Sequence, residues 1–150
     1  MNRRFFSAVG VVMVASGLNY FGDRLLGVKL ELFSGISTFS FAWVLDLFLL
    51  PFLIGMLVSW LYGNGGRWLS YLPPLIVRSL SYAQILYFTG KPHGSSLIPL
   101  GWWGLFVILA VESCSFGGII GEVVIRKTYG RSTPQPEESK QASPADVPNV

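Results

Sequence analysis

The chain has 150 residues, of which 51% are hydrophobic and only 13% are charged, with a net charge of +3 and a mean hydropathy of +0.53. Soluble domains carry about 25% charged residues, so this composition excludes an ordinary soluble domain. The apolar residues come in long runs, which predicts an all-α integral membrane bundle of about four transmembrane helices. Because the basic residues flank these runs, as topology signals do, we expect no nucleic-acid binding.

The first apolar run covers residues 5–21 and follows the basic residues Arg3 and Arg4. At about 17 residues it is at the lower limit for a membrane span. The alternative is a cleaved signal peptide, with residues 5–14 as its apolar core and the small residues 15–17 as its cleavage region. Because apolar residues continue beyond that region, we favour an uncleaved first helix.

The second run covers residues 36–61 and is separated from the first by a polar stretch, residues 22–34. Within this stretch, residues 29–32 alternate between charged and apolar side chains, as in a short strand or an interfacial segment. About 26 helical residues would rise about 39 Å, which exceeds the roughly 30 Å of the hydrocarbon core. We therefore expect the second helix to tilt or bend, with Pro51 near its middle as the kink point.

The turn at residues 63–67, Gly-Asn-Gly-Gly-Arg, predicts an antiparallel third helix close to the second. That run, residues 68–88, is the least hydrophobic and carries Arg78. It either spans the membrane or dips into it as a re-entrant hairpin, and we favour a span because the runs on both sides cross. The fourth run covers residues 97–125, and the Pro- and Ser-rich residues 128–150 predict a disordered tail.

The runs define one transmembrane domain, residues 1–127, followed by the tail. Basic residues near the spans are divided unequally between the two predicted sides. One side has Arg3, Arg4, Arg67, Arg126, Lys127 and Arg131, and the other has Arg24, Lys29 and Lys91. Since the more basic side is cytoplasmic, we expect both termini and the tail in the cytoplasm. The protein would be a multi-pass protein of the cytoplasmic or inner membrane.

Ionisable residues inside spans are informative because each costs at least about 2.5–3.5 kcal/mol at the centre of the bilayer. Asp46, Arg78 and Glu112 lie in three different runs, at depths that overlap near the middle of the membrane. We expect a cluster in which Arg78 bridges the two carboxylates. Such a cluster could form a proton or substrate path. We favour a structural ion pair that fixes helix register, or a contact to another subunit.

Small residues recur every four positions in the fourth run, at Ser113, Gly117 and Gly121. This pattern predicts a face on which two helix backbones approach closely. We favour internal packing over a dimer face because the third run must pack against a neighbour. Polar residues on one face of the third run and one face of the fourth run predict that these two helices pair.

The sequence offers little chemistry for catalysis. The single cysteine, Cys114, and the single histidine, His93, are too few for a zinc site within one chain. The chain has none of the common catalytic or phosphate-binding motifs, so we expect no catalytic residues, no metal and no cofactor.

The leading hypothesis is a noncatalytic accessory subunit or assembly factor of a larger membrane complex. Its partners would be membrane lipids and other membrane protein subunits, or further copies of this chain. The alternative is a small ion- or proton-coupled transporter or channel working as a homo-oligomer. A third, weaker hypothesis is an intramembrane lipid-modifying enzyme that uses Asp46, Arg78 and Glu112.

Overall fold

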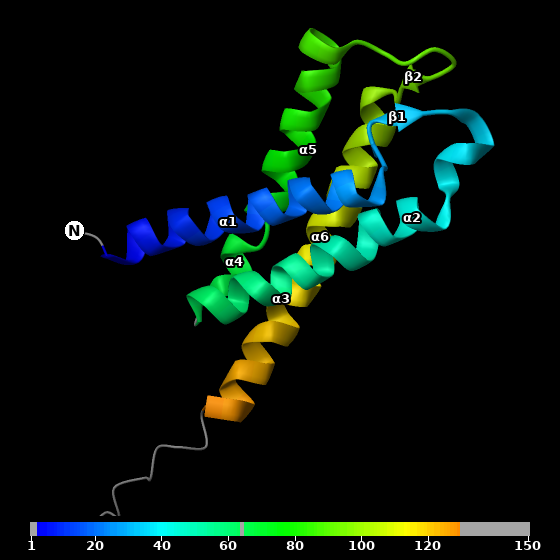
Figure 1. Ribbon diagram of the computed structural model, residues 1–150. Helices are drawn as coiled ribbons and strands as arrows, with labels where there is room; N and C mark the ends of the chain where they lie inside the picture. The colour runs from blue at the N-terminus through cyan, green and yellow to red at the C-terminus, as the bar shows by residue number, and fades with distance from the viewer. Residues whose placement is uncertain (1–2, 64, 130–150) are drawn as a thin grey trace, which may run out of the picture.

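The computed structural model describes residues 3–63 and 65–129, which are helical apart from two short strands and the connecting loops (Figure 1). The elements in chain order are α1 Arg3–Leu26, β1 Leu32–Phe33, the 3-10 helix η1 Gly35–Phe39, α2 Phe41–Val44, the π-helix η2 Leu45–Leu49, α3 Leu50–Tyr62, α4 Gly66–Leu69, α5 Leu72–Gln84, the π-helix η3 Ile85–Thr89, β2 Ser96–Leu97 and α6 Leu100–Tyr129. Since α2, η2 and α3 are continuous, as are α5 and η3, the described residues form four long helical segments. The predicted all-α class is confirmed.

Three helices are long and apolar enough to cross a membrane: Phe5–Leu26, Phe41–Tyr62 and Leu100–Thr128. The predicted first, second and fourth spans fall within them, apart from a few residues at their ends. The predicted third span corresponds to α4, α5 and η3, which do not meet this criterion among the described residues. Of the predicted tail, Thr128 and Tyr129 continue α6, and residues 130–150 lie outside the described residues.

The first helix ends, and the second helix begins, at a residue other than the one predicted. α1 continues past residue 21 to Leu26 because the polar Asn19 and Asp23 are buried against the rest of the bundle. The second helix starts at Phe41, where the Ser40 hydroxyl accepts a hydrogen bond from the Trp43 N–H at 3.2 Å. This is an ordinary N-cap, and it separates the helix from the preceding 3-10 turn.

Pro51, the predicted kink point, lies in the first turn of α3, directly after the π-helical segment η2. Proline has no N–H, and its ring collides with the carbonyl four residues earlier, here that of Leu47. The helix widens before the proline, so that the Leu50 N–H donates to the carbonyl of Leu45, five residues back. The widened turn contains Asp46, whose side chain is fully buried.

The two most closely packed helices are α3 and α6. A Cβ atom on Gly55 of α3 would overlap the backbone carbonyl of Cys114, and one on Gly117 of α6 would overlap the carbonyl of Phe52. A Cβ on Gly121 would lie 2.9 Å from the carbonyl oxygen of Met56. Two helix backbones can lie this close only where side chains are absent.

The predicted small-residue face therefore lies inside the protein, but its partner is the second helical segment rather than the third. The half-buried Ser113 lies at one end of this face. The Ser59 hydroxyl of α3 adds a hydrogen bond of 2.7 Å to the carbonyl of Gly118. The other side of Gly118 faces Ser70, after α4, whose hydroxyl would lie 2.5 Å from an added Cβ. α6 thus contacts the third segment at this end through α4, and it also contacts α5.

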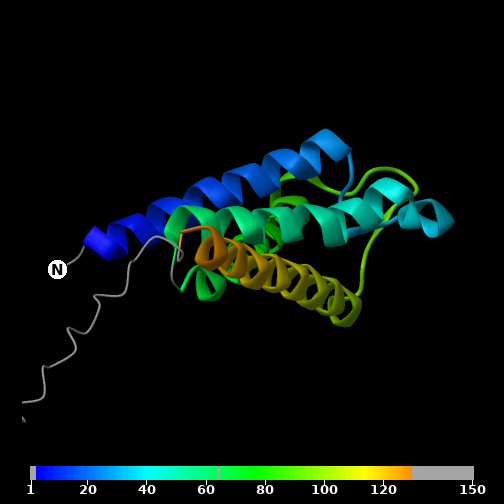
Figure 2. The same ribbon diagram turned by 90° about the horizontal axis from the view of Figure 1, so that it is seen from below.

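Seen from below, α3 lies between α1 and α6 (Figure 2), while α5 contacts both α1 and α6. At the opposite end from α4, β1 and β2 pair antiparallel, with Leu32 opposite Leu97. β1 begins at Leu32, the last residue of the stretch 29–32, whose alternation predicted a short strand or an interfacial segment. Because of this pairing, the loop after α1 and the loop before α6 lie at the same end of the bundle (Figure 1).

Candidate functional site

Arg78, from the middle of α5, is almost fully buried, with 2% of its surface exposed. Pro73 and Pro74 occupy the first turn of α5, where the missing N–H groups have no helical partner to lose. A buried guanidinium needs partners for its charge and its five donors. The structure supplies them from three different parts of the chain.

Three carboxylates surround the Arg78 guanidinium. Nη2 lies 2.7 Å from Asp23 Oδ1 and 3.2 Å from Asp46 Oδ2, and Nη1 lies 3.4 Å from Glu31 Oε1. Asp23 comes from α1, Glu31 from the segment before β1, and Asp46 from η2. We call Asp23, Glu31, Asp46 and Arg78 the Arg78 network. It joins every helical segment except α6.

The structure brings two of the three predicted cluster residues together and corrects the third. Asp46 and Arg78 form an ion pair, but Glu112 is exposed on α6 and lies outside the network. Depth along a helix does not determine which way a side chain points. Arg78 faces α1 and η2, whereas α5 meets α6 through Tyr82, whose ring centroid lies 5.0 Å from that of Trp103.

Sequence reasoning missed Asp23 and Glu31. Asp23 lies just beyond the predicted first run, residues 5–21, and shares one helix face with Ser16 and Asn19 at spacings of three and four. That polar face was a usable signal. Glu31 lies in the alternating stretch 29–32, where alternation predicts that neighbouring side chains point to opposite sides. Instead Leu30, Glu31 and Leu32 are all buried, and nothing local in the sequence predicts this.

The Arg78 network contains three acidic groups and one basic group, so it would carry a net charge of −2 if every group were ionised. Burying such a charge is costly, and the cost is relieved by bound protons or by a further cation. Removal from water raises the pKa of Glu31, in spite of the opposing attraction of Arg78. The arrangement can therefore hold a proton or accept a positively charged group.

This raised pKa predicts a pH dependence of stability. A carboxyl that binds its proton more tightly in the folded state contributes stability that is complete below its unfolded pKa, near 4.5, and is lost as the pH rises through its folded pKa. We expect the melting temperature in detergent to fall more steeply above pH 4.5 for the wild type than for Glu31→Gln, which does not titrate. Parallel pH profiles for the two proteins would contradict this prediction.

Several buried polar atoms near the network have no protein partner. Asn19 is fully buried with neither amide atom hydrogen-bonded, and the Ser16 hydroxyl lies three residues away on the same face of α1. Asp46 Oδ1 and Arg78 Nε are likewise unpaired within the described residues. Buried polar atoms are rarely left unpaired. These groups therefore show that the polar interior of the bundle extends beyond the ion pairs of the Arg78 network.

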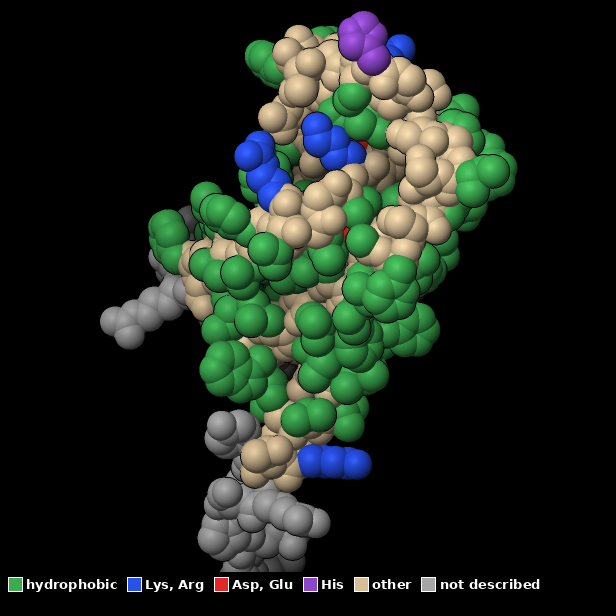
Figure 3. Space-filling view, turned by 45° about the vertical axis from the view of Figure 1, so that its right-hand side comes forward, with side chains coloured by type: hydrophobic (Ala, Val, Ile, Leu, Met, Phe, Trp, Pro, Cys, Tyr) green, Lys and Arg blue, Asp and Glu red, His purple; other side chains and the backbone are tan. Residues whose placement is uncertain are grey.

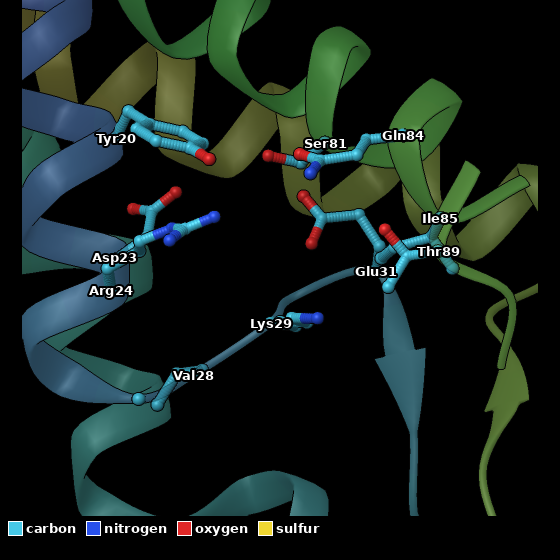
Figure 4. Close-up of a pocket in the computed structure, with 11 residues that line it drawn as sticks. Tyr20, Asp23, Arg24, Val28, Lys29, Glu31, Ser81, Gln84, Ile85 and Thr89 are labelled. Carbon is cyan, nitrogen blue, oxygen red and sulfur yellow. The ribbon is translucent and has the colours of Figure 1, made fainter. Parts of the chain in front are cut away.

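A cavity of about 290 Å³ lies beside the network, between the end of α1, the following loop and α5 (Figure 4). The side chains of Tyr20 and Asp23 line it from α1, and those of Glu31, Ser81 and Gln84 face them from the other side. Arg24 and Lys29, both exposed, also border it. Figure 3 shows basic side chains gathered near the upper end of the molecule, above a broad hydrophobic band.

Among the described residues, no group of three or more His, Cys, Asp and Glu side chains is arranged to hold a metal ion. Comparison of the chain with protein-family models, with curated proteins and with solved structures finds no match.

Proposed function

We propose that this chain is a noncatalytic accessory subunit or assembly factor of a larger membrane complex, with four spans and both termini in the cytoplasm. The observation that carries the proposal is the position of Glu112. Its side chain is exposed near the middle of α6, within the membrane-span candidate Leu100–Thr128. A carboxyl facing lipid at that depth costs at least about 2.5–3.5 kcal/mol.

The residues around Glu112 support a protein partner rather than a water-filled path. Exposed apolar side chains lie one and two turns away on the same face of α6. They are Leu105, Ile108, Phe116 and Ile119. We call this surface, together with Glu112, the Glu112 face. A partner helix that packs on the apolar side chains and presents an arginine, a lysine or another hydrogen-bond donor to Glu112 would remove the cost of exposing it.

The pairing of β1 with β2 supports four crossings. If the segment from Phe41 to Tyr62 crosses the membrane, the chain must return through α5 and η3 before β2 can meet β1 on the original side. The burial of Arg78 supports the same conclusion, since the least apolar segment keeps its charge away from lipid. The excess of basic residues in α4 and toward the carboxyl end of α6 supports a cytoplasmic location for that side.

The alternative, a small ion- or proton-coupled transporter or channel working as a homo-oligomer, draws support from a different observation. The unpaired polar atoms of Ser16, Asn19 and Asp46 extend the Arg78 network into the bundle. Such a line could conduct protons between carboxyl groups. This function requires transport by the purified chain alone, whereas an accessory subunit requires a partner.

Photo-crosslinking in cells tests the two functions against each other. A photoreactive residue at Phe116 on the Glu112 face is compared with one at Met13, which is at least as exposed but lies on α1. We expect the Phe116 variant to crosslink to one other membrane protein that carries a basic or hydrogen-bonding residue near the middle of a span. Glu112→Ala should reduce this product at least about tenfold, the effect of losing about 1.4 kcal/mol, and crosslinks from Met13 should be unaffected.

Two results would overturn the proposal. Equal crosslinking from Phe116 and Met13, unchanged by Glu112→Ala, would mean that the Glu112 face has no specific partner. A crosslink to a second copy of the chain, together with ion or proton flux into vesicles containing only the purified protein, would establish the transporter alternative instead.

A further inference from the structure

We propose that the groove between α1 and α5 binds a phospholipid whose headgroup carries both a phosphate and a primary ammonium, with this headgroup in the cavity beside the Arg78 network. Two hollows in the structure together form the site. The polar cavity of about 290 Å³ and an apolar groove of about 490 Å³ share Tyr20 and Gln84 as lining residues. A ligand that fills both must be polar at one end and apolar at the other.

The apolar groove has the position expected for an acyl chain. It lies between α1 and α5 and is lined mainly by small and apolar side chains, among them Gly17, Val77, Leu80 and Phe88. Leu80 and Phe88 are among the most exposed apolar side chains of the third segment. Since α1 is a membrane-span candidate, the groove opens to the hydrocarbon region. The polar cavity lies at the end of α1, at the depth of lipid headgroups.

The charges of the cavity select a zwitterion. Its inner part is acidic, with Asp23 and Glu31 exceeding the single positive charge of Arg78. Its outer part is basic, with the exposed side chains of Arg24 and Lys29. An ammonium group inside would offset the surplus carboxylate charge, and a phosphate outside would meet the two basic side chains. A simple cation would have to pass the basic outer part of the cavity, and a simple anion would be repelled by the acidic inner part.

The lining groups also favour a primary ammonium over a quaternary one. The ammonium of a phosphoethanolamine headgroup has three N–H donors. Acceptors are available in the carboxylates of Asp23 and Glu31 and in the Tyr20 hydroxyl, whose side chains converge on the cavity (Figure 4). A choline headgroup has no N–H donor and would leave these buried acceptors unpaired. A glycerol headgroup has no positive charge to offset the carboxylates in the inner part of the cavity.

The test measures the lipid retained by the purified full-length protein. After exchange into detergent and incubation with equal amounts of ethanolamine, choline and glycerol phospholipids, native mass spectrometry should show one ethanolamine lipid bound in preference to the others. Gly17→Leu should fill the groove, because no atom lies within 4 Å of a Cβ added there, and should reduce retention at least about tenfold. Gly10→Leu on the same helix has equal open space but lies outside the groove, and should have no effect.

A second variant tests recognition of the lipid headgroup without changing a residue in a helix. Lys29→Gln, on the exposed loop, should weaken retention of the ethanolamine lipid about fivefold, since each basic residue near a lipid phosphate contributes on the order of a factor of five. Equal retention of ethanolamine and choline lipids, or full retention by both variants, would overturn the proposal. Binding of free phosphoethanolamine as tightly as the whole lipid would also overturn it, because the groove would then have no part in binding.

Discussion

Arg78→Met should leave little folded protein, because it removes the only positive charge from a buried group of three carboxyls. Removing one partner of a buried ion pair typically costs about 3–5 kcal/mol, since the remaining charge is left without compensation. That is a large part of the roughly 5–15 kcal/mol by which proteins are stable. The measurement is thermal unfolding in mild detergent, followed by the loss of the monodisperse peak in size-exclusion chromatography.

Arg126→Met provides the matched control. Arg126 pairs with Glu122 at 2.7 Å, but this pair is one turn apart on α6 and the arginine is exposed. Exposed pairs of this kind are worth about 0.3–0.5 kcal/mol, so the control should unfold close to the wild-type temperature. Neutralising the acidic partners should restore part of the stability lost by Arg78→Met. The rescue variant combines R78M with D23N, E31Q and D46N. Wild-type stability of Arg78→Met alone would show that the network does not hold the helices together.

Gly117→Ala should destabilise the bundle by about 1–3 kcal/mol or more, through a single added methyl group. The new Cβ would overlap the carbonyl oxygen of Phe52, which is backbone and cannot rotate away, so α3 and α6 must separate. Gly104→Ala, in the same helix, meets no atom within 4 Å and should be neutral or stabilising, since alanine favours helix over glycine by about 1 kcal/mol. Unfolding by increasing fractions of a denaturing detergent compares the two. Equal stability of the two variants would contradict the described packing of α3 on α6.

Much of the helical architecture is predictable because its signals are local. A long apolar run is readable from consecutive residues, and three such runs correspond to span candidates in the structure. Likewise, the spacing of Gly117 and Gly121 indicates a close contact without reference to the rest of the chain. The identity of the partner helix is not local information. We expected the third segment, and the main contact is with α3 because Gly55 there supplies the complementary space.

The composition of the Arg78 network could be predicted only in part, for a related reason. Depth in the membrane suggested that Asp46 and Arg78 could meet, but it did not distinguish Glu112 from Asp23 as the second acid. That choice depends on the rotation of α5 about its axis, which is fixed by neighbours distant in sequence. The position of Glu31 is still harder to predict from the sequence, because Glu31 reaches the network through a loop that is held by the pairing of β1 with β2.

The proposed topology has four membrane crossings, with the Arg78-bearing segment as the third. Labelling of single cysteines in intact cells tests this directly, in a background where the buried Cys114 is replaced by alanine. The probe positions, all exposed, are Ser37, Arg67, His93 and Lys127. With a membrane-impermeant maleimide, cysteines at 37 and 93 should react in intact cells, and those at 67 and 127 only after permeabilisation. Labelling of positions 37 and 93 from opposite sides would contradict this topology, because α5 and η3 would then not cross the membrane.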